Sequence, residues 1–326
     1  MRKEFNHGWK FRNISNETFA EVCLPHDAML SEQRMPSAGG KSASGFFPGG
    51  KYIYEKTFEL PEGTEEKHIT FEFEGAYKNA EVYLNGRKAG GCSYGYLPFF
   101  VCGDGFLKTG ENVIRVETDN SAQPDSRWYS GAGLYRPVWM HVQEKEYIEP
   151  EGVKIRTCSV SPAQIEVKTE HQGGEIEVCI QKDGKEIVKE KGDKVLLDLP
   201  DAQLWSDETP VLYTARVTLK KDGRELETVE EEFGIRQITW NRGGLFINGK
   251  KTLLRGGCLH HDNGILGACT YDESEERKIR ILKENGFNAV RSSHNPCSKA
   301  LLRACDRIGM YVMDETWDMW YRKKSQ

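Results

Sequence analysis

The chain has 326 residues, and its 45 Lys and Arg against 50 Asp and Glu give a formal net charge of −5. Hydrophobic residues make up 38% and charged residues 29% of the sequence, a globular composition that excludes a disordered, collagenous or coiled-coil chain. No run approaches the roughly 18 apolar residues of a transmembrane helix. The negative net charge argues against a nucleic-acid binder that neutralises phosphates. At about 100–200 residues per domain, the length predicts two or three domains.

The start of the chain is basic, but no apolar stretch follows it that would make a secretory signal. The nine cysteines are scattered, without Cys-x-x-Cys or zinc-finger spacing. An odd number of scattered cysteines is typical of free thiols in a reducing compartment. We therefore expect a cytoplasmic protein without a structural zinc site.

Residues 1–145 are expected to form an all-β domain. Alternating apolar and polar residues at 52–60 and 68–75 predict strands, and Asn85-Gly86 predicts a tight hairpin turn. Many short strands with Gly-rich turns and no amphipathic helix favour a sandwich or jelly roll.

Residues 146–238 repeat the β pattern on a smaller scale. Asp183-Gly184 and Asp222-Gly223 each separate two predicted strands. Two such hairpins within about 90 residues are typical of an immunoglobulin-like sandwich of about 100 residues.

From residue 239 onward the pattern changes to alternating strands and helices. We expect strands at 251–256, 287–291 and 310–314, with helices at 270–285 and 298–308 between them. Short β-α-β-α-β connections predict parallel strands with right-handed crossovers. Three such strands do not form a covered sheet alone, so we expect residues 239–326 to be the truncated start of a larger domain.

Local signals set the ends of these helices. Thr270 and Glu273 form a capping-box pattern, which predicts Thr270 as the N-cap of the first helix. Ser298 is predicted to cap the second helix, and Gly286 and Gly309 follow the two helices and are predicted to end them.

Several motifs together resemble glycoside hydrolase family 2, the β-galactosidase and β-glucuronidase group. Each motif is moderately specific, but their order and spacing extend over nearly the whole chain. The motifs are, in chain order, 5–11 (FNHGWKF), 127–138 (RWYSGAGLYRPV), 204–213 (LWSDETPVLY), 233–236 (FGIR), 254–262 (LRGGCLHHD), 288–296 (NAVRSSHNP) and 305–315 (CDRIGMYVMDE).

The resemblance implies a multidomain, mainly β protein with three parts. These are a jelly-roll sugar-binding domain (1–145), an immunoglobulin-like β-sandwich (146–238) and the first β/α units of a (β/α)8 TIM barrel (239–326). It also implies the N-terminal part of a retaining β-glycosidase of β-galactosidase type, which hydrolyses terminal β-glycosidic bonds.

Retaining enzymes of this family use two glutamates, one as acid/base and one as nucleophile. In the family both come from later barrel strands, the acid/base after an Asn-Glu pair. Here the pair Asn16-Glu17 lies in the N-terminal β domain, far from the barrel motifs. We therefore expect no catalytic residue within this chain, and we expect the chain alone to be inactive.

Five residues are expected to bind substrate by their motif positions. His260 and His294 resemble family histidines that hydrogen-bond sugar hydroxyls, since a neutral imidazole can donate and accept. Arg291 resembles the arginine that orients the catalytic carboxylates, for which a fixed fork of donors is suited. Trp128 and Asp125 lie in the loop that reaches toward the barrel mouth. The alternatives are a domain-interface role for Trp128 and plain loop hydrogen bonds for the histidines.

Other tryptophans have simpler expected roles. Trp9 and Trp205 are predicted to be domain-core residues, while Trp317 and Trp320 follow the third barrel strand and are predicted to line the barrel mouth.

Neither a carboxylate pair nor a metal site is expected among the residues at these strand ends. Asp314-Glu315 are adjacent on a strand, so their side chains point to opposite faces and cannot share one bond; a supporting role is expected for Glu315. His260-His261 diverge in the same way and no H-x-x-x-H pair exists, so no metal site is expected. The resemblance requires no cofactor and leaves open a magnesium or sodium ion in the full-length enzyme.

The expected partner is a β-linked oligosaccharide or glycoside, with no nucleic acid and no membrane; a homo-oligomeric full-length protein is left open. A non-catalytic carbohydrate-binding β-sandwich module is the alternative, and a β-rich interaction protein is a third class. His260, Arg291 and His294 favour the enzyme, because a pure binding module has no use for barrel strands. The sequence decides neither the sugar nor the linkage.

Overall fold

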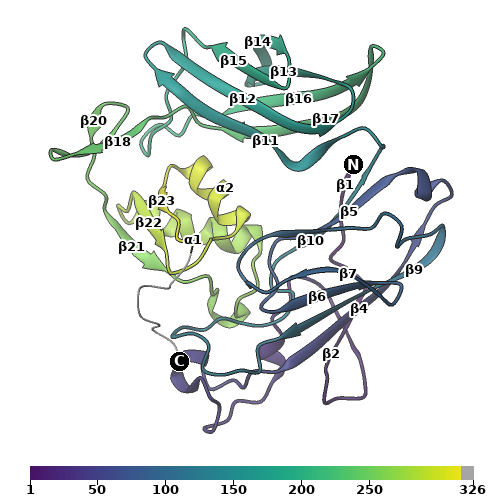
Figure 1. The fold of residues 1–326 in the computed structure, drawn as a ribbon. Coiled ribbons are helices and arrows are strands. Elements are labelled where there is room, and N and C mark those ends of the chain that lie inside the picture. The colour runs from purple at the N-terminus through teal and green to yellow at the C-terminus, as the bar shows by residue number, and fades with distance from the viewer. Residues whose placement is uncertain (317–326) are drawn as a thin grey trace.

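The computed structural model describes residues 1–316 and has a mainly β, multidomain architecture, as predicted (Figure 1). Two β-sandwiches follow one another along the chain, and a segment of alternating strands and helices packs against both. We call these parts the N-terminal sandwich (residues 2–143), the middle sandwich (147–233) and the β/α segment (238–313).

The N-terminal sandwich consists of two antiparallel sheets, with strand orders β3-β2-β4-β9-β6-β7 and β1-β10-β5-β8. Its strands are β1 (Arg2–Glu4), β2 (Trp9–Asn13), β3 (Ala20–Val22), β4 (Lys51–Leu60), β5 (His68–Phe73), β6 (Ala80–Leu84), β7 (Arg87–Cys92), β8 (Phe99–Cys102), β9 (Gly110–Asp119) and β10 (Val138–Gln143). Short 3-10 helices lie at Ala28–Ser31, Lys41–Ser44 and Thr64–Glu66.

Apolar side chains from both sheets form one core in this sandwich, including Tyr54 and Ile114 from one sheet and Phe71 from the other. The period-two alternation seen in the sequence places these residues on the inner faces. The hairpin between β6 and β7 turns at Asn85-Gly86, where both residues have positive φ angles of 48° and 78°. This is the predicted tight turn, because a type I′ turn needs positive φ at both central residues.

The middle sandwich packs a three-stranded sheet, β11-β12-β15, on a four-stranded sheet, β14-β13-β16-β17. Its strands are β11 (Tyr147–Val160), β12 (Ala163–Gln172), β13 (Glu175–Lys182), β14 (Lys185–Lys191), β15 (Lys194–Asp198), β16 (Tyr213–Lys221) and β17 (Arg224–Phe233). Both predicted Asp-Gly turns are present, since Asp183 and Asp222 each have a φ of 49° and each joins two paired strands.

The β/α segment begins with a small antiparallel sheet and continues as parallel strands in the order β21-β22-β23. Its elements are β18 (Ile238–Asn241), β19 (Gly244–Ile247), β20 (Lys250–Lys251), β21 (Gly256–Leu259), a 3-10 helix (Gly264–Leu266), α1 (Asp272–Glu284), β22 (Ala289–Ser292), α2 (Lys299–Ile308) and β23 (Tyr311–Met313). The predicted β-α-β-α-β order and parallel direction are therefore confirmed.

The first of these strands was predicted at 251–256, and this placement was wrong. The strand β21 starts at Gly256, where the backbone comes into register with Ala289 of β22. A Cβ atom at position 256 would lie 2.5 Å from the carbonyl oxygen of Ala289, so glycine permits this close approach. Lys250 and Lys251 pair instead with β19.

The predicted helix ends were correct except for one cap. Ser298 is the N-cap of α2, and its hydroxyl accepts the Leu301 N–H at 3.1 Å. Thr270 does not cap α1: the N-cap is Tyr271, without a side-chain cap bond. The Thr270 side chain is buried, and its hydroxyl donates to the carbonyl of Ala268, two residues earlier, at 3.3 Å. The Thr270 N–H donates to the carbonyl of Tyr135 at 3.1 Å, so the residue is held against the N-terminal sandwich and does not cap the helix.

Both predicted core tryptophans are buried, and Trp205 also joins two parts of the molecule. Trp9 is fully buried, and its indole N–H donates to the carbonyl of Phe5 at 2.7 Å. The Trp205 indole N–H donates to the carbonyl of Asp306 at 2.8 Å, and its ring lies edge-on to Tyr311. The connection between β15 and β16 of the middle sandwich is thereby fixed to α2 and β23.

Asp27 fixes the N-terminal sandwich to the β/α segment. Its carboxylate is 2% exposed and accepts backbone N–H groups of Met29 and Ala132 at Oδ1, both at 3.0 Å. At Oδ2 it accepts the Tyr129 hydroxyl at 2.7 Å and the Ala268 N–H at 2.8 Å. Burial raises the pKa of Asp27, and the four donors act against that change. This contact orients the loop that follows β21.

None of the helices in the described part of the chain is long and apolar enough to cross a membrane. All nine cysteines lie within the described residues, and each is a free thiol.

Candidate functional site

Polar side chains gather where the three parallel strands of the β/α segment end. His260 follows β21, Arg291 and His294 lie at the end of β22 and just after it, and Glu315 follows β23. In a parallel sheet the carboxyl ends of the strands share one edge, which is where such folds place their active sites. The predicted grouping of His260, Arg291 and His294 follows from this topology.

A carboxylate clamp fixes two of these residues. The Arg291 Nε donates to Glu315 Oε1 at 2.6 Å, and the His294 Nδ1 lies 2.8 Å from Glu315 Oε2. Burial would raise the pKa of Glu315, but hydrogen bonds from Arg291 and His294, together with the Arg291 charge, hold it below its ordinary value. The ionised carboxylate keeps the proton on His294 Nδ1 and leaves Nε2 as the ring acceptor.

An aromatic side chain from the N-terminal sandwich covers the histidines. The Trp128 ring stacks on His260 at 5.5 Å with an interplanar angle of 20°, and it meets His294 edge-on at 5.4 Å. The two histidine rings are 5.9 Å apart. The Trp128 indole N–H donates to the Tyr96 hydroxyl at 3.2 Å, which fixes the ring in this position. Trp128 therefore lies at a domain interface and also lines the site.

One buried polar atom in this group is unpaired. The His260 Nδ1 is buried and has no hydrogen-bond partner among residues 1–316. Buried polar atoms in proteins almost always have a partner. Three other buried atoms on the loops after β21 and β22 are also unpaired among the described residues: His261 Nδ1, Ser293 Oγ and Asn295 Oδ1.

Asp125 is connected to the histidines only through other side chains. Its side chain is 6% exposed, accepts the Tyr77 hydroxyl at 3.1 Å and pairs with the Lys78 ammonium at 3.2 Å. The Tyr77 ring in turn packs on Tyr96 at 5.1 Å, and Tyr96 holds Trp128. The contacts of Asp125 are thus supporting ones in this structure, and its assignment as a substrate ligand stays a prediction.

His261 points away from His260, as expected for adjacent residues. Burial lowers the pKa of His261 to about 3, so its ring is neutral at physiological pH. Its Nε2 donates to the carbonyl of Ser130 at 2.9 Å, and its ring lies between Tyr96 and Tyr135. His261 thus fixes the loop that carries Trp128.

Sequence reasoning missed Tyr96 and Arg136, which support the site from a distance in sequence. The Arg136 guanidinium is buried and donates to the carbonyl of Tyr96 at 2.9 Å and to that of Pro296 at 3.0 Å. It thereby holds the loop after His294 against the N-terminal sandwich. Arg136 lies within the quoted motif RWYSGAGLYRPV, so the signal was present, but its partner lies 160 residues away.

Both carboxylates that follow β23 accept hydrogen bonds. Glu315 binds Arg291 and His294, while Asp314 accepts the Cys297 N–H at 3.0 Å, so the two side chains diverge as predicted. Within residues 1–316 these two carboxylates do not form a catalytic pair. Trp317 and Trp320, predicted at the barrel mouth, lie outside the described residues.

Comparison with known proteins gives one consistent family. Residues 238–319 match the model "Glycosyl hydrolases family 2, TIM barrel domain", and residues 152–236 match the model "Glycosyl hydrolases family 2".

Two curated relatives align along nearly the whole chain. A β-galactosidase from Bacteroides ovatus is 34% identical over 99% of this chain and 42% of its own length. A putative β-glucuronidase from Formosa agariphila is 29% identical over 99% of this chain and 34% of its own length. The chain therefore spans less than half the length of these relatives.

A solved structure of similar fold is a glycosyl hydrolase family 2 member from Bacteroides cellulosilyticus. It has a TM-score of 0.92 and 31% identity, and the match covers 100% of this chain and 47% of that one.

Proposed function

Because the chain belongs to glycoside hydrolase family 2, we propose that it supplies the sugar-binding side of the active site of a retaining β-glycosidase of β-galactosidase type. The proposed substrate is a terminal β-linked sugar in an oligosaccharide or glycoside. The observation that supports this most strongly is the convergence of Trp128, His260 and His294 at the strand ends.

The chemistry of these side chains suits a sugar ring. The apolar C–H face of a pyranose packs on an aromatic ring, and half-buried Trp128 offers one beside the histidines. We propose that His260 and His294 hydrogen-bond the sugar hydroxyls. The Nε2 of His294 can accept a hydroxyl proton because Glu315 holds the proton on Nδ1. Contacts of this kind accelerate the reaction only where they strengthen in the transition state.

Arg291 has a different proposed role. Its guanidinium is fixed by Glu315 at the end of β22, where its positive charge adds to the electrostatic field of the site. A preorganised cation of this kind can orient the carboxylates that attack the anomeric carbon and move the proton. We propose that those two carboxylates come from barrel units beyond the three strands described here, so that residues 1–326 alone are inactive.

The proposed reaction needs two carboxyl groups and no cofactor. The nine free thiols support a reducing, cytoplasmic setting. The relatives include proteins named β-galactosidase and putative β-glucuronidase, so the identity of the sugar has to be determined by assaying both classes of substrate.

The test is the stereochemistry of hydrolysis by a polypeptide that carries this chain together with the remaining barrel units. We expect turnover of an aryl β-galactoside with the β-anomer as the first product in proton NMR, since double displacement retains configuration. The matched substrate is the corresponding β-glucuronide. If the α-anomer appears first, the retaining mechanism is wrong. If sugars bind but no β-glycoside is cleaved, the non-catalytic binding module is the better account.

A further inference from the structure

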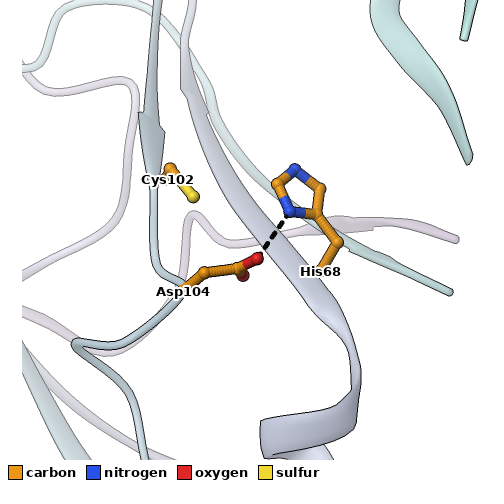
Figure 2. Close-up of side chains that lie close together, drawn as sticks. All are labelled: His68, Cys102 and Asp104. Atoms are coloured by element: carbon orange, nitrogen blue, oxygen red, sulfur yellow. Dashed lines mark hydrogen bonds and ion pairs between the residues drawn. The ribbon is translucent and has the colours of Figure 1, made fainter. Parts of the chain in front are cut away.

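A second cluster of chemically reactive side chains lies in the N-terminal sandwich, on residues that the proposed reaction does not use. His68 is the first residue of β5, Cys102 is the last residue of β8, and Asp104 follows in the next turn. The two strands are antiparallel neighbours, and Thr70 is paired with Cys102. Figure 2 shows the three side chains directed toward one another.

The geometry of the cluster is close to that of a metal site. One ligand atom from each of His68, Cys102 and Asp104 lies within 4.8 Å of the other two, and His68 Nδ1 is 2.8 Å from Asp104 Oδ2. Zinc bonds of about 2.0–2.3 Å in a tetrahedron place such atoms roughly 3.3–3.8 Å apart. The side chains therefore reach this arrangement with shifts of about 1 Å.

Contacts around the cluster hold two of the ligands in place. The His68 Nε2 lies 3.0 Å from the Thr70 hydroxyl, and the ring stacks on Tyr147 at 4.1 Å with an interplanar angle of 7°. Asp104 Oδ1 accepts the Ile69 N–H at 3.0 Å, which turns Oδ2 toward His68. Such partners behind a histidine and a carboxylate are typical of metal sites, where they fix the ligand atoms.

Against the expectation from cysteine spacing, we propose that His68 Nδ1, Cys102 Sγ and Asp104 Oδ2 bind a zinc ion, with water as the fourth ligand. A nitrogen, a sulfur and an oxygen ligand favour zinc over magnesium or calcium, which take oxygen ligands. Cys102 is exposed, so solvent reaches the sulfur and can supply the water.

Zinc binding releases one proton and brings two negative charges to the ion. On binding, Cys102 loses its thiol proton to solvent, and the proton on His68 Nδ1 moves to Nε2, which then donates to the Thr70 hydroxyl. The thiolate and the carboxylate together cancel the two positive charges of zinc. The Lys145 ammonium lies 3.6 Å from Asp104 Oδ2 on an exposed side chain, and the ion displaces it.

The test uses cobalt as a spectroscopic substitute for zinc in metal-free residues 1–326. We expect a thiolate-to-cobalt charge-transfer band in the near ultraviolet that reaches its plateau at about one equivalent and disappears when zinc is added. Cys102→Ser should abolish the band, and His68→Ala should weaken cobalt binding by about tenfold or more.

Cys23→Ser is the matched control, because the Cys23 sulfur lies 3.5 Å from His7 Nδ1 but belongs to no three-ligand group among residues 1–316. It should leave the band unchanged, and near-ultraviolet circular dichroism should confirm that every variant is folded. A band that survives in folded Cys102→Ser protein, or the absence of any band in the folded parent, would overturn the proposal.

Discussion

As the pH falls from about 4.5 to about 2, the protein should lose about 3 kcal/mol of unfolding free energy through Glu72 alone. This carboxylate is 2% exposed on β5 and lies where all three parts of the molecule meet. It contacts Arg2 at 3.1 Å, the His141 ring at 2.8 Å and the Lys299 ammonium at 2.5 Å. Lys299 is the first residue of α2, and it also forms an ion pair with Glu151 of the middle sandwich.

The direction of this effect follows from the pKa of Glu72. Burial acts to raise it, but the hydrogen bond from His141 and the charges of Lys299 and Arg2 outweigh burial and lower it to about 2. A carboxyl group with a lowered pKa in the folded state contributes stability above its unfolded pKa. That contribution disappears as the pH falls toward the folded value.

Urea unfolding of the parent and of Glu72→Gln across this pH range measures the effect. The variant should be less stable by about 3 kcal/mol at pH 7 and nearly equal to the parent near pH 2. Glu81→Gln is the control, because Glu81 is an exposed carboxylate that pairs with Lys88 on the surface. If Glu72→Gln keeps the full acid dependence of the parent, the network does not stabilise the junction.

Glu315→Gln should lower kcat/KM for aryl β-glycosides by about tenfold or more, which corresponds to at least about 1.4 kcal/mol of transition-state stabilisation. The assay uses a polypeptide that carries this chain and the remaining barrel units. Glutamine keeps the size of the side chain but removes the charge, so it cannot accept from Arg291 and His294 at both positions. Both residues then lose the orientation that the proposed site needs.

A double-mutant cycle separates this positioning role from a general loss of stability. His294→Ala alone should lower kcat/KM, and adding Glu315→Gln should cost less than it does in the parent, since the two residues act as a unit. Asp314→Asn is the control, because Asp314 faces the Cys297 N–H instead of the clamp. Simple addition of the two effects, or an unchanged kcat/KM in Glu315→Gln, would contradict the assignment.

The features that could be predicted from the sequence are those decided by local chemistry. The Asn-Gly and Asp-Gly turns, the Ser298 cap and the strand-helix alternation depend on neighbouring residues. The Thr270 cap failed because its hydroxyl bonds to the carbonyl of Ala268. The same loop is fixed by the Ala268 N–H, which donates to the carboxylate of Asp27, 241 residues earlier. No local sequence pattern predicts a contact over that distance.

The site itself was predictable only in part. The grouping of His260 and His294 follows from parallel strands, because their ends share an edge. The placement of Trp128 over them depends on a loop more than 130 residues earlier, which the family resemblance suggested and spacing did not. Tyr96 and Arg136 act through backbone and ring contacts that leave no residue pattern. His68 and Cys102 are 34 residues apart, so register between β5 and β8 brings them together.

Turnover of aryl β-galactosides and β-glucuronides by purified residues 1–326 tests the central claim most directly. The claim is that this chain supplies sugar-binding contacts and lacks the catalytic carboxylates. Retaining hydrolysis needs two free carboxyl groups about 5–5.5 Å apart, and Glu315 is occupied by Arg291 and His294. With protein from a host that lacks its own β-galactosidase, we predict no hydrolysis above background. Clear turnover that disappears in Glu315→Gln would contradict the account and place the catalytic centre on Glu315.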